Sequence, residues 1–208
     1  MNYQSNNYSP NTQFSVFPPA VKHLLIINGI FFVGLSTPGV AQFLFEYGAL
    51  WPIGSGLFQP WQLVTYMFLH GGFGHIFFNL FALWMFGQSI ENYWGTKRFT
   101  VFYFLTGIGA AILHMFIGGG GAPTIGASGA VYGILLAFGM MFPNREIMLL
   151  FPPIPMKAKY FVALFGVIEL ISGISRTDSG VAHFAHLGGM LVGYILIKYW
   201  GIKGEQYY

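Results

Sequence analysis

The sequence predicts an all-α protein, a polytopic membrane bundle of six transmembrane helices, on the basis of three observations. Charged residues make up 7% of the 208 residues, against roughly 25% in an ordinary soluble domain. Hydrophobic residues make up 55%, aromatic residues 19%, and glycines number 29, as expected where helices face lipid and pack closely through small residues. The apolar residues fall into six runs that lack the polar and apolar alternation of membrane strands. The protein is therefore expected to be integral to a lipid membrane.

The composition also excludes several classes of function. The chain contains no cysteine, which removes disulfides, cysteine-ligated zinc and cysteine nucleophiles. Its net charge of +3 is spread thinly along the sequence, so no nucleic-acid partner is expected. The aromatic and methionine residues are expected to face lipid or the core. No cofactor is predicted.

The six runs define one membrane domain between two polar tails. Residues 1–20 are expected to be a disordered cytoplasmic tail, residues 21–200 the membrane domain, and residues 201–208 a short cytoplasmic tail. Most runs approach the ~20 residues that cross a bilayer as a helix; the fourth and fifth are shorter, and re-entrant or tilted segments are an alternative for them. The runs cover residues 23–45, 72–90, 99–117, 126–142, 159–174 and 182–200.

The positions of the basic residues predict the orientation. If both termini are cytoplasmic, eight of the nine basic residues lie inside and only Arg176 lies outside, which fits the tendency of inner loops to carry Lys and Arg. The second, fourth and sixth helices then begin at the outer face. The long aromatic loop 46–63 is expected to lie in the outer membrane interface. The eight inner residues are Lys22, Lys97, Arg98, Arg145, Lys157, Lys159, Lys198 and Lys203.

Three polar features from distant parts of the sequence share this outer level. His70 and His75 form one histidine pair, and His183 and His186 form another. The fourth run begins at the same level, with Gly126-Ala127-Ser128-Gly129. Because ionisable groups are costly inside a membrane, they are candidates for function.

A serine between glycines at a helix start is suited to nucleophilic catalysis. The N–H groups of the first turn lack helical partners and favour a developing oxyanion. A neutral histidine within hydrogen-bond reach can activate the hydroxyl, and His186 is predicted to be that base for Ser128. Gly129 in the fourth run and Gly189 in the sixth each start a small-xxx-small pattern, so the two helices are expected to approach closely. The structural alternative is that Ser128 only packs against another helix.

Other side chains are expected to complete the site. His75 and Asn79 are four residues apart, so they share a helix face and could donate hydrogen bonds to an oxyanion. Tyr132 lies one turn after Ser128 and is expected to support the ring of His186. No acidic residue stands near either motif in the sequence, which favours a Ser-His dyad over a triad. Glu169 is expected to pair with a neighbouring polar group rather than to take part in catalysis, and Glu91 is expected to tie the inner ends of helices together.

These motifs resemble those of rhomboid intramembrane serine proteases. The resemblance covers about residues 21–200 and rests on His70-x4-His75-x3-Asn79, Gly126-Ala127-Ser128-Gly129 and Ala185-His186-Leu187-Gly188-Gly189, with Gly87-x3-Glu91 and Trp94-Gly95 beside them. One departure is that Trp61-Gln62 stands where the family often has Trp-Arg, which affects a loop-stabilising contact.

The resemblance implies a serine endopeptidase that cleaves single-span or polytopic membrane proteins near the outer face. It implies Ser128 as nucleophile, His186 as base and His75 and Asn79 as oxyanion-hole donors. His70 would organise the loop and Tyr132 would pack on His186. It also implies a bacterial plasma membrane.

Two other functions are considered. A non-catalytic rhomboid-like protein would bind transmembrane helices, but it is expected to lack the serine or the histidine, and both are present. The histidines could instead bind a metal or haem, or serve a transporter. No His-Glu-x-x-His motif accompanies them, and we expect no metal.

Overall fold

A computed structural model describes residues 14–118, 121–148, 153–175 and 182–204, and all six predicted runs are mainly helical in it. Two of the described helices, Phe73–Trp94 and Thr96–Ile117, are long and apolar enough to cross a membrane by length and composition. The all-helical character of the predicted runs is confirmed, whereas the count of six spans stays a prediction. The long helices are α1 (Pro19–Leu35), α4 (Phe73–Trp94), α5 (Thr96–Leu113), α6 (Ser128–Met141), α7 (Ala158–Ile174) and α8 (His183–Tyr199).

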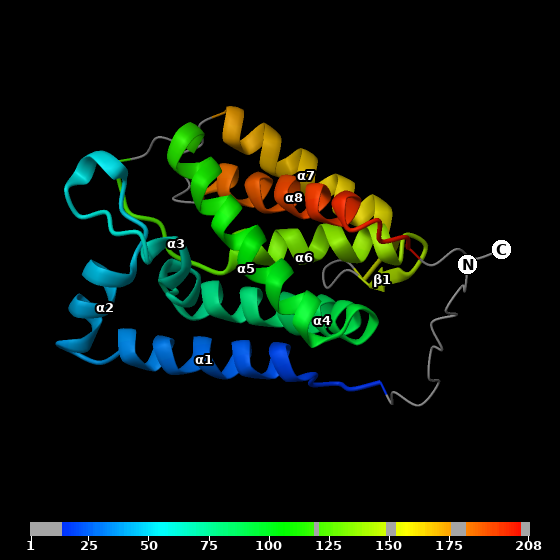
Figure 1. Ribbon diagram of the computed structural model, residues 1–208, viewed down its shortest axis with the longest axis horizontal. Coiled ribbons are helices and arrows are strands. Elements are labelled where there is room, and N and C mark those ends of the chain that lie inside the picture. The colour runs from blue at the N-terminus through cyan, green and yellow to red at the C-terminus, as the bar shows by residue number, and fades with distance from the viewer. Residues whose placement is uncertain (1–13, 119–120, 149–152, 176–181, 205–208) are drawn as a thin grey trace, which may run out of the picture.

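The first run, residues 23–45, is not the single helix that its apolar residues predict. It is divided between α1 and a shorter helix, α2 (Val40–Gly48), which points away from the axis of α1 (Figure 1). The break contains Pro38, which has no N–H to donate and disfavours helical geometry in the residue before it. The hydroxyl groups of Ser36 and Thr37 donate back to the carbonyls of Phe32 and Val33, so the end of α1 satisfies its own last turn.

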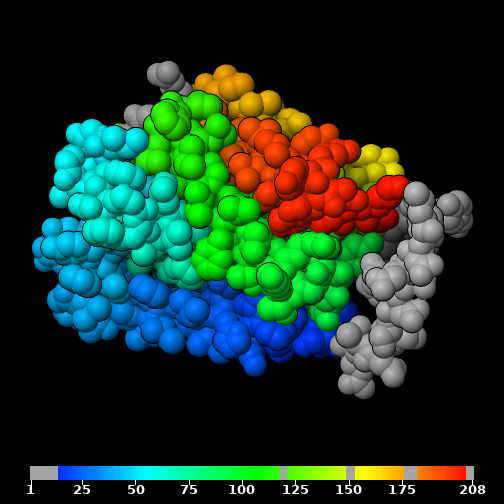
Figure 2. All heavy atoms as spheres, viewed as in Figure 1, coloured from blue at the N-terminus to red at the C-terminus, as the bar shows by residue number. Residues whose placement is uncertain are grey.

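Helix α6 is the centre of the bundle. It packs against α4, α5, α7 and α8, and its apolar residues are buried nearly all round. Figure 2 shows α5 crossing between the segment before α4, drawn in cyan, and α8, drawn in orange and red. The largest fully buried side chains include Tyr66, Tyr103, Phe99, Phe102, Leu83 and Ile134.

Helices α4, α6 and α8 all begin at one end of the bundle, and α1 begins at the other (Figure 1). The eight basic residues predicted to lie inside belong to the elements of that other end. They lie in the first turns of α1, α5 and α7, at the end of α8, in the α6 to α7 connection or just after α8. That connection contains an antiparallel pair of short strands, β1 (Glu146–Met148) and β2 (Pro155–Lys157), with Ile147 opposite Met156.

Glu91 ties α4 to α1 at this basic end, as predicted. Its two carboxylate oxygens accept hydrogen bonds from the N–H groups of Ala20 and Val21, each at 2.8 Å. The Thr96 hydroxyl, at the start of α5, also donates to Glu91 at 2.7 Å. A carboxylate on the first-turn N–H groups satisfies donors that no helical carbonyl reaches.

The segment between α2 and α4 is organised around Gln62. This segment contains η1 (Ile53–Ser55), α3 (Gln62–Thr65) and η2 (Tyr66–Phe68). The Gln62 side chain is fully buried; its oxygen accepts from the N–H groups of Trp51 and Gln59, and its nitrogen donates to the carbonyls of Tyr47 and Leu57. Gln62 therefore makes the contacts that stabilise this loop.

Candidate active site

Ser128 is the first residue of α6, and the backbone before it is held in place from two sides. The Gly126 N–H donates to the Tyr66 carbonyl at 2.9 Å, and Leu50 and Thr124 exchange two backbone hydrogen bonds at 2.9 Å. Gly126 has φ +127°, and a Cβ there would lie 2.7 Å from Nε2 of His75. Only glycine fits this conformation and this approach. The first helical bond of α6 runs from the Val131 N–H to the Ala127 carbonyl, so the Ser128 N–H precedes the helical ladder.

Helices α6 and α8 approach closely at the glycines, as their spacing predicts. A Cβ at Gly189 would overlap the backbone carbonyl of Gly129, and one at Gly193 would lie 3.4 Å from the carbonyl oxygen of Gly133. Small residues at both positions let the two backbones meet. The crossing begins beside the candidate site, because Gly129 directly follows Ser128 and Gly189 lies three residues after His186.

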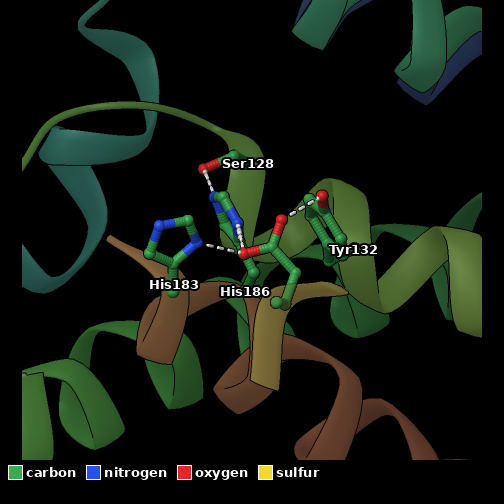
Figure 3. Close-up of polar contacts among 5 residues, drawn as sticks. Ser128, Tyr132, His183 and His186 are labelled. Atoms are coloured by element: carbon green, nitrogen blue, oxygen red, sulfur yellow. Dashed lines mark hydrogen bonds and ion pairs between the residues drawn. The ribbon is translucent and has the colours of Figure 1, made fainter. Parts of the chain in front are cut away.

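The structure brings Ser128 and His186 together. Ser128 Oγ lies 2.7 Å from His186 Nε2, and Figure 3 shows the two side chains facing each other. The Tyr132 ring stacks on the imidazole, with centroids 4.3 Å apart and planes inclined by 6°. The three side chains expected to form the site therefore lie in contact, while the roles of Ser128 as nucleophile and His186 as base stay predictions.

Sequence reasoning did not identify the acidic neighbour of His186. Glu169 of α7 is 6% exposed, and its Oε1 accepts a hydrogen bond from the Tyr132 hydroxyl. Its Oε2 lies 2.7 Å from His183 Nδ1 and 2.9 Å from His186 Nδ1 (Figure 3). The expected pairing of Glu169 with a polar group is therefore present. The expectation that no acidic residue approaches the histidine was wrong. Glu169 is 17 positions before His186 in the sequence and reaches it from another helix.

His75 approaches the serine from α4, while the amide of Asn79 is directed partly to its own helix. The Gly71 N–H donates to His75 Nδ1 at 3.4 Å, which leaves the proton of a neutral ring on Nε2, the nitrogen near Gly126. Asn79 Nδ2 donates to the His75 carbonyl at 2.9 Å. One N–H of the Asn79 amide remains for a further acceptor.

His70 supports the segment before Ser128. It is buried and packs edge-on against His75, with ring centroids 4.9 Å apart. Its Nε2 accepts from the Ala127 N–H at 3.5 Å. Burial, reinforced by the nearby His75, lowers the pKa of His70 to about 4, so the ring is neutral near pH 7 and can accept this bond. His114, for which the sequence predicts no role, contacts the Thr124 hydroxyl at 2.9 Å.

Glu169, His183 and His186 are the side chains that could hold a metal ion in the described part of the chain, with ligand atoms within 4.8 Å of one another. The N to O separations of 2.7 and 2.9 Å are those of direct contacts. Two ligands of one zinc ion, each at about 2.0–2.2 Å, lie roughly 3.3 Å apart at a tetrahedral angle. The geometry therefore fits a hydrogen-bonded cluster better than a metal site.

Comparisons with known proteins agree with these motifs. Residues 57–202 match the family model of the Rhomboid domain. The chain is 27% identical over 201 residues to rhomboid protein 1, mitochondrial, of Saccharomyces cerevisiae, covering 92% of this chain and 56% of that protein. It is 32% identical over 151 residues to rhomboid-like protease 3 of Toxoplasma gondii, covering 72% and 55%. It is 31% identical over 135 residues to rhomboid protease GluP of Bacillus subtilis, covering 64% and 25%. The chain thus spans between a quarter and a little over half of these relatives.

Proposed function

Because the chain belongs to the rhomboid family, which is membrane-embedded and includes intramembrane proteases such as GluP, we propose that this protein is itself an intramembrane serine endopeptidase. The observation that carries the proposal is the 2.7 Å contact between Ser128 Oγ and His186 Nε2. A hydroxyl within hydrogen-bond reach of an imidazole is the arrangement that activates serine. A non-catalytic helix-binding protein of this fold would not need that contact.

The reaction is acyl transfer in two stages. Ser128 Oγ attacks the carbonyl carbon of the scissile peptide bond while its proton passes to His186 Nε2. The tetrahedral intermediate collapses when His186 returns that proton to the leaving amine nitrogen, which leaves an acyl ester on Ser128. Water then attacks the ester, again with His186 as base, and releases the second product.

The oxyanion is assigned to three donors at the start of α6. These are the Ser128 N–H, the Nε2–H of His75 and the remaining N–H of Asn79. The close approach of His75 to Gly126 and the position of Ser128 ahead of the helical ladder support this assignment. Loss of one such donor typically costs about 10²–10³-fold in kcat, so Asn79→Ala should lower kcat by that order with little change in KM.

The proposed substrates are single-span or polytopic membrane proteins, cut near the outer face. Two observations support six spans and cytoplasmic termini. The eight basic residues lie in elements at one end of the bundle, and Ser128, at the start of α6, lies at the opposite end. The relatives include proteins named as mitochondrial and chloroplastic, so family membership alone does not select the bacterial plasma membrane expected from the sequence. Protease accessibility of tags at the two termini in sealed vesicles tests the orientation.

The enzyme assignment is tested with purified protein and a model single-span substrate. Ser128→Ala and His186→Ala should each abolish cleavage, and a fluorophosphonate probe should label the wild type but not Ser128→Ala. Ser89→Ala is the matched control, because Ser89 is buried in α4 near Arg145, at the basic end of the bundle. It should keep both labelling and cleavage. Cleavage by Ser128→Ala at the wild-type rate would overturn the assignment.

A further inference from the structure

Helix α7 is mostly apolar and carries one buried carboxylate, Glu169. Its large residues Leu164, Val167, Ile168 and Leu170 are exposed on the surface of the bundle, whereas Glu169 is 6% exposed. An ionised carboxylate removed from water is costly unless other groups bond to it. The partners of Glu169 should therefore explain its presence.

The carboxylate is held from two helices, each of which also carries a member of the proposed site. Oε1 accepts from the hydroxyl of Tyr132 on α6, the residue whose ring stacks on His186. Oε2 accepts from Nδ1 of His183 on α8, at 2.7 Å, one turn before His186. Two donors from two helices fix both the position and the rotation of the group.

The fixed carboxylate faces the nitrogen of His186 that does not face the serine. Nε2 must accept the proton of Ser128, so the neutral ring carries its proton on Nδ1, and Nδ1 lies 2.9 Å from Oε2. The distance is that of an ion pair, but the oxygen lies off the direction of the ring N–H, so the contact lacks hydrogen-bond geometry. Nδ1 has no other hydrogen-bond partner in the described part of the chain. Catalytic hydrogen bonds are often poorly aligned before substrate binds and tighten in the substrate complex.

We propose that Glu169 is a positioning residue for the general base, so that Ser128, His186 and Glu169 act as a triad rather than a Ser-His dyad. The inference rests on the proposed function and deepens it. When Ser128 attacks, its proton moves to Nε2 and the Nδ1 proton stays on the ring. The ionised carboxylate holds the reactive tautomer and stabilises the imidazolium without taking a proton itself. Tyr132 and His183 act through Glu169 by holding it.

The direct test is Glu169→Gln, which keeps the size of the side chain and removes its charge. We expect kcat for the model substrate to fall on the order of 10²-fold with KM nearly unchanged. That loss is smaller than the ~10⁴-fold loss when the aspartate of a serine-protease triad becomes asparagine. The reason is that the N–H of His186 Nδ1 does not point directly at Glu169 Oε2. The matched control is Glu91→Gln, a second buried carboxylate at the far end of α4, which should leave the rate per folded molecule unchanged.

The pH dependence separates positioning from a purely structural role. Among the described residues, the titratable groups near His186 are Glu169 from α7, Tyr132 from α6, His183 on its own helix, His75 from α4 and His114 after α5. Only the Glu169 charge is changed in Glu169→Gln. Without a carboxylate to stabilise the imidazolium, the acid limb of the kcat profile should move to lower pH.

A double-mutant cycle tests the role of Tyr132. Tyr132→Phe keeps the stacked ring and removes the hydroxyl, so it should lower kcat several-fold in the wild type and have almost no further effect in Glu169→Gln. Chelation with EDTA should not change the wild-type rate; a loss would show that the cluster acts by binding metal.

The inference is overturned if Glu169→Gln keeps kcat within about threefold of wild type, or if its acid limb does not move. In that case an inactive Ser128→Ala variant would still support the proposed protease. An active Ser128→Ala variant would instead overturn the protease itself, so the two failures are distinguishable.

Discussion

Replacing Gly189 by alanine tests whether the crossing of α6 and α8 holds the nucleophile and the base in register. The added methyl group would overlap the backbone carbonyl of Gly129, and backbone cannot move aside as a flexible side chain can. We estimate that the helices must separate by more than about 1 Å at this point for the carbon and oxygen atoms to reach a normal contact. Gly129 directly follows Ser128, and Gly189 lies three residues after His186. The 2.7 Å contact between Ser128 and His186 should therefore open beyond hydrogen-bond range.

The expected effect on catalysis is larger than the effect on stability. A misplacement of ~1 Å can cost about 10²-fold in rate, whereas overpacking of this kind typically costs about 1–3 kcal/mol of folding free energy. Cleavage of the model substrate and thermal unfolding, both in the same detergent, measure the two quantities. Gly29→Ala is the control, because Gly29 is inside α1 and a Cβ there meets nothing within 4 Å. It should keep the wild-type rate and be equally or more stable.

The reasoning would be refuted by a Gly189→Ala variant that cleaves at the wild-type rate. Such a result would mean that the close backbone approach is not what sets the distance between Ser128 and His186. A variant that is unfolded in detergent would not decide the question, so Gly193→Ala is the companion substitution. Its Cβ would lie 3.1 Å from the Phe102 ring and 3.4 Å from the Gly133 carbonyl oxygen, and it should cause a smaller loss of the same kind.

Three further predictions concern stability. Gln62→Leu should lower the free energy of unfolding by about 2–4 kcal/mol, because four backbone groups each lose a hydrogen bond; Gln62→Glu, which keeps the acceptor, should lose less, and equal thermal melting of all three proteins would contradict this. Glu91→Gln should cost about 1–2 kcal/mol through the weakened start of α1, seen as a lower melting temperature. Because burial lowers the pKa of His70 to about 4 from 6.5, the folded state resists a proton that the unfolded state accepts. Stability should therefore be constant above about pH 6.5 and fall toward pH 4 by on the order of 3 kcal/mol, with a shallower fall in His70→Gln.

The parts of the fold that depend on periodicity and spacing along one helix could be predicted from the sequence. The apolar runs gave the long helices, and the glycine spacing gave the close approach of α6 and α8. The position of Ser128, His75 and His186 at one end of the bundle followed from the alternating direction of successive helices. These properties require only that an apolar run be helical and that short connections join antiparallel neighbours.

Features that depend on contacts between distant segments were harder to predict. The break after α1 could have been read from Pro38, but the apolar residues on both sides of it made one long run. The role of Gln62 could not, because the backbone groups that it bonds belong to Tyr47, Trp51, Leu57 and Gln59, and their positions are set by how the loop folds back on itself.

The position of Glu169 could be predicted in part, because the sequence of α7 indicates which face of the helix packs against the bundle. Val162, Gly166, Glu169 and Gly173 recur at intervals of four, three and four residues, which places them on one face of α7. Two of these positions are glycines that face α8. A Cβ added at Gly166 would meet Met190, and one added at Gly173 would meet His183 and Phe184. A carboxylate on the face that packs against the histidine-bearing helix has to find its partners there. The spacing thus predicts that Glu169 faces α8, but not which of His183 and His186 it reaches, because that depends on the rotation of α8 about its own axis. The crossing at Gly129 and Gly189 fixes that rotation, so the residues that bring the base to Ser128 also bring it to Glu169.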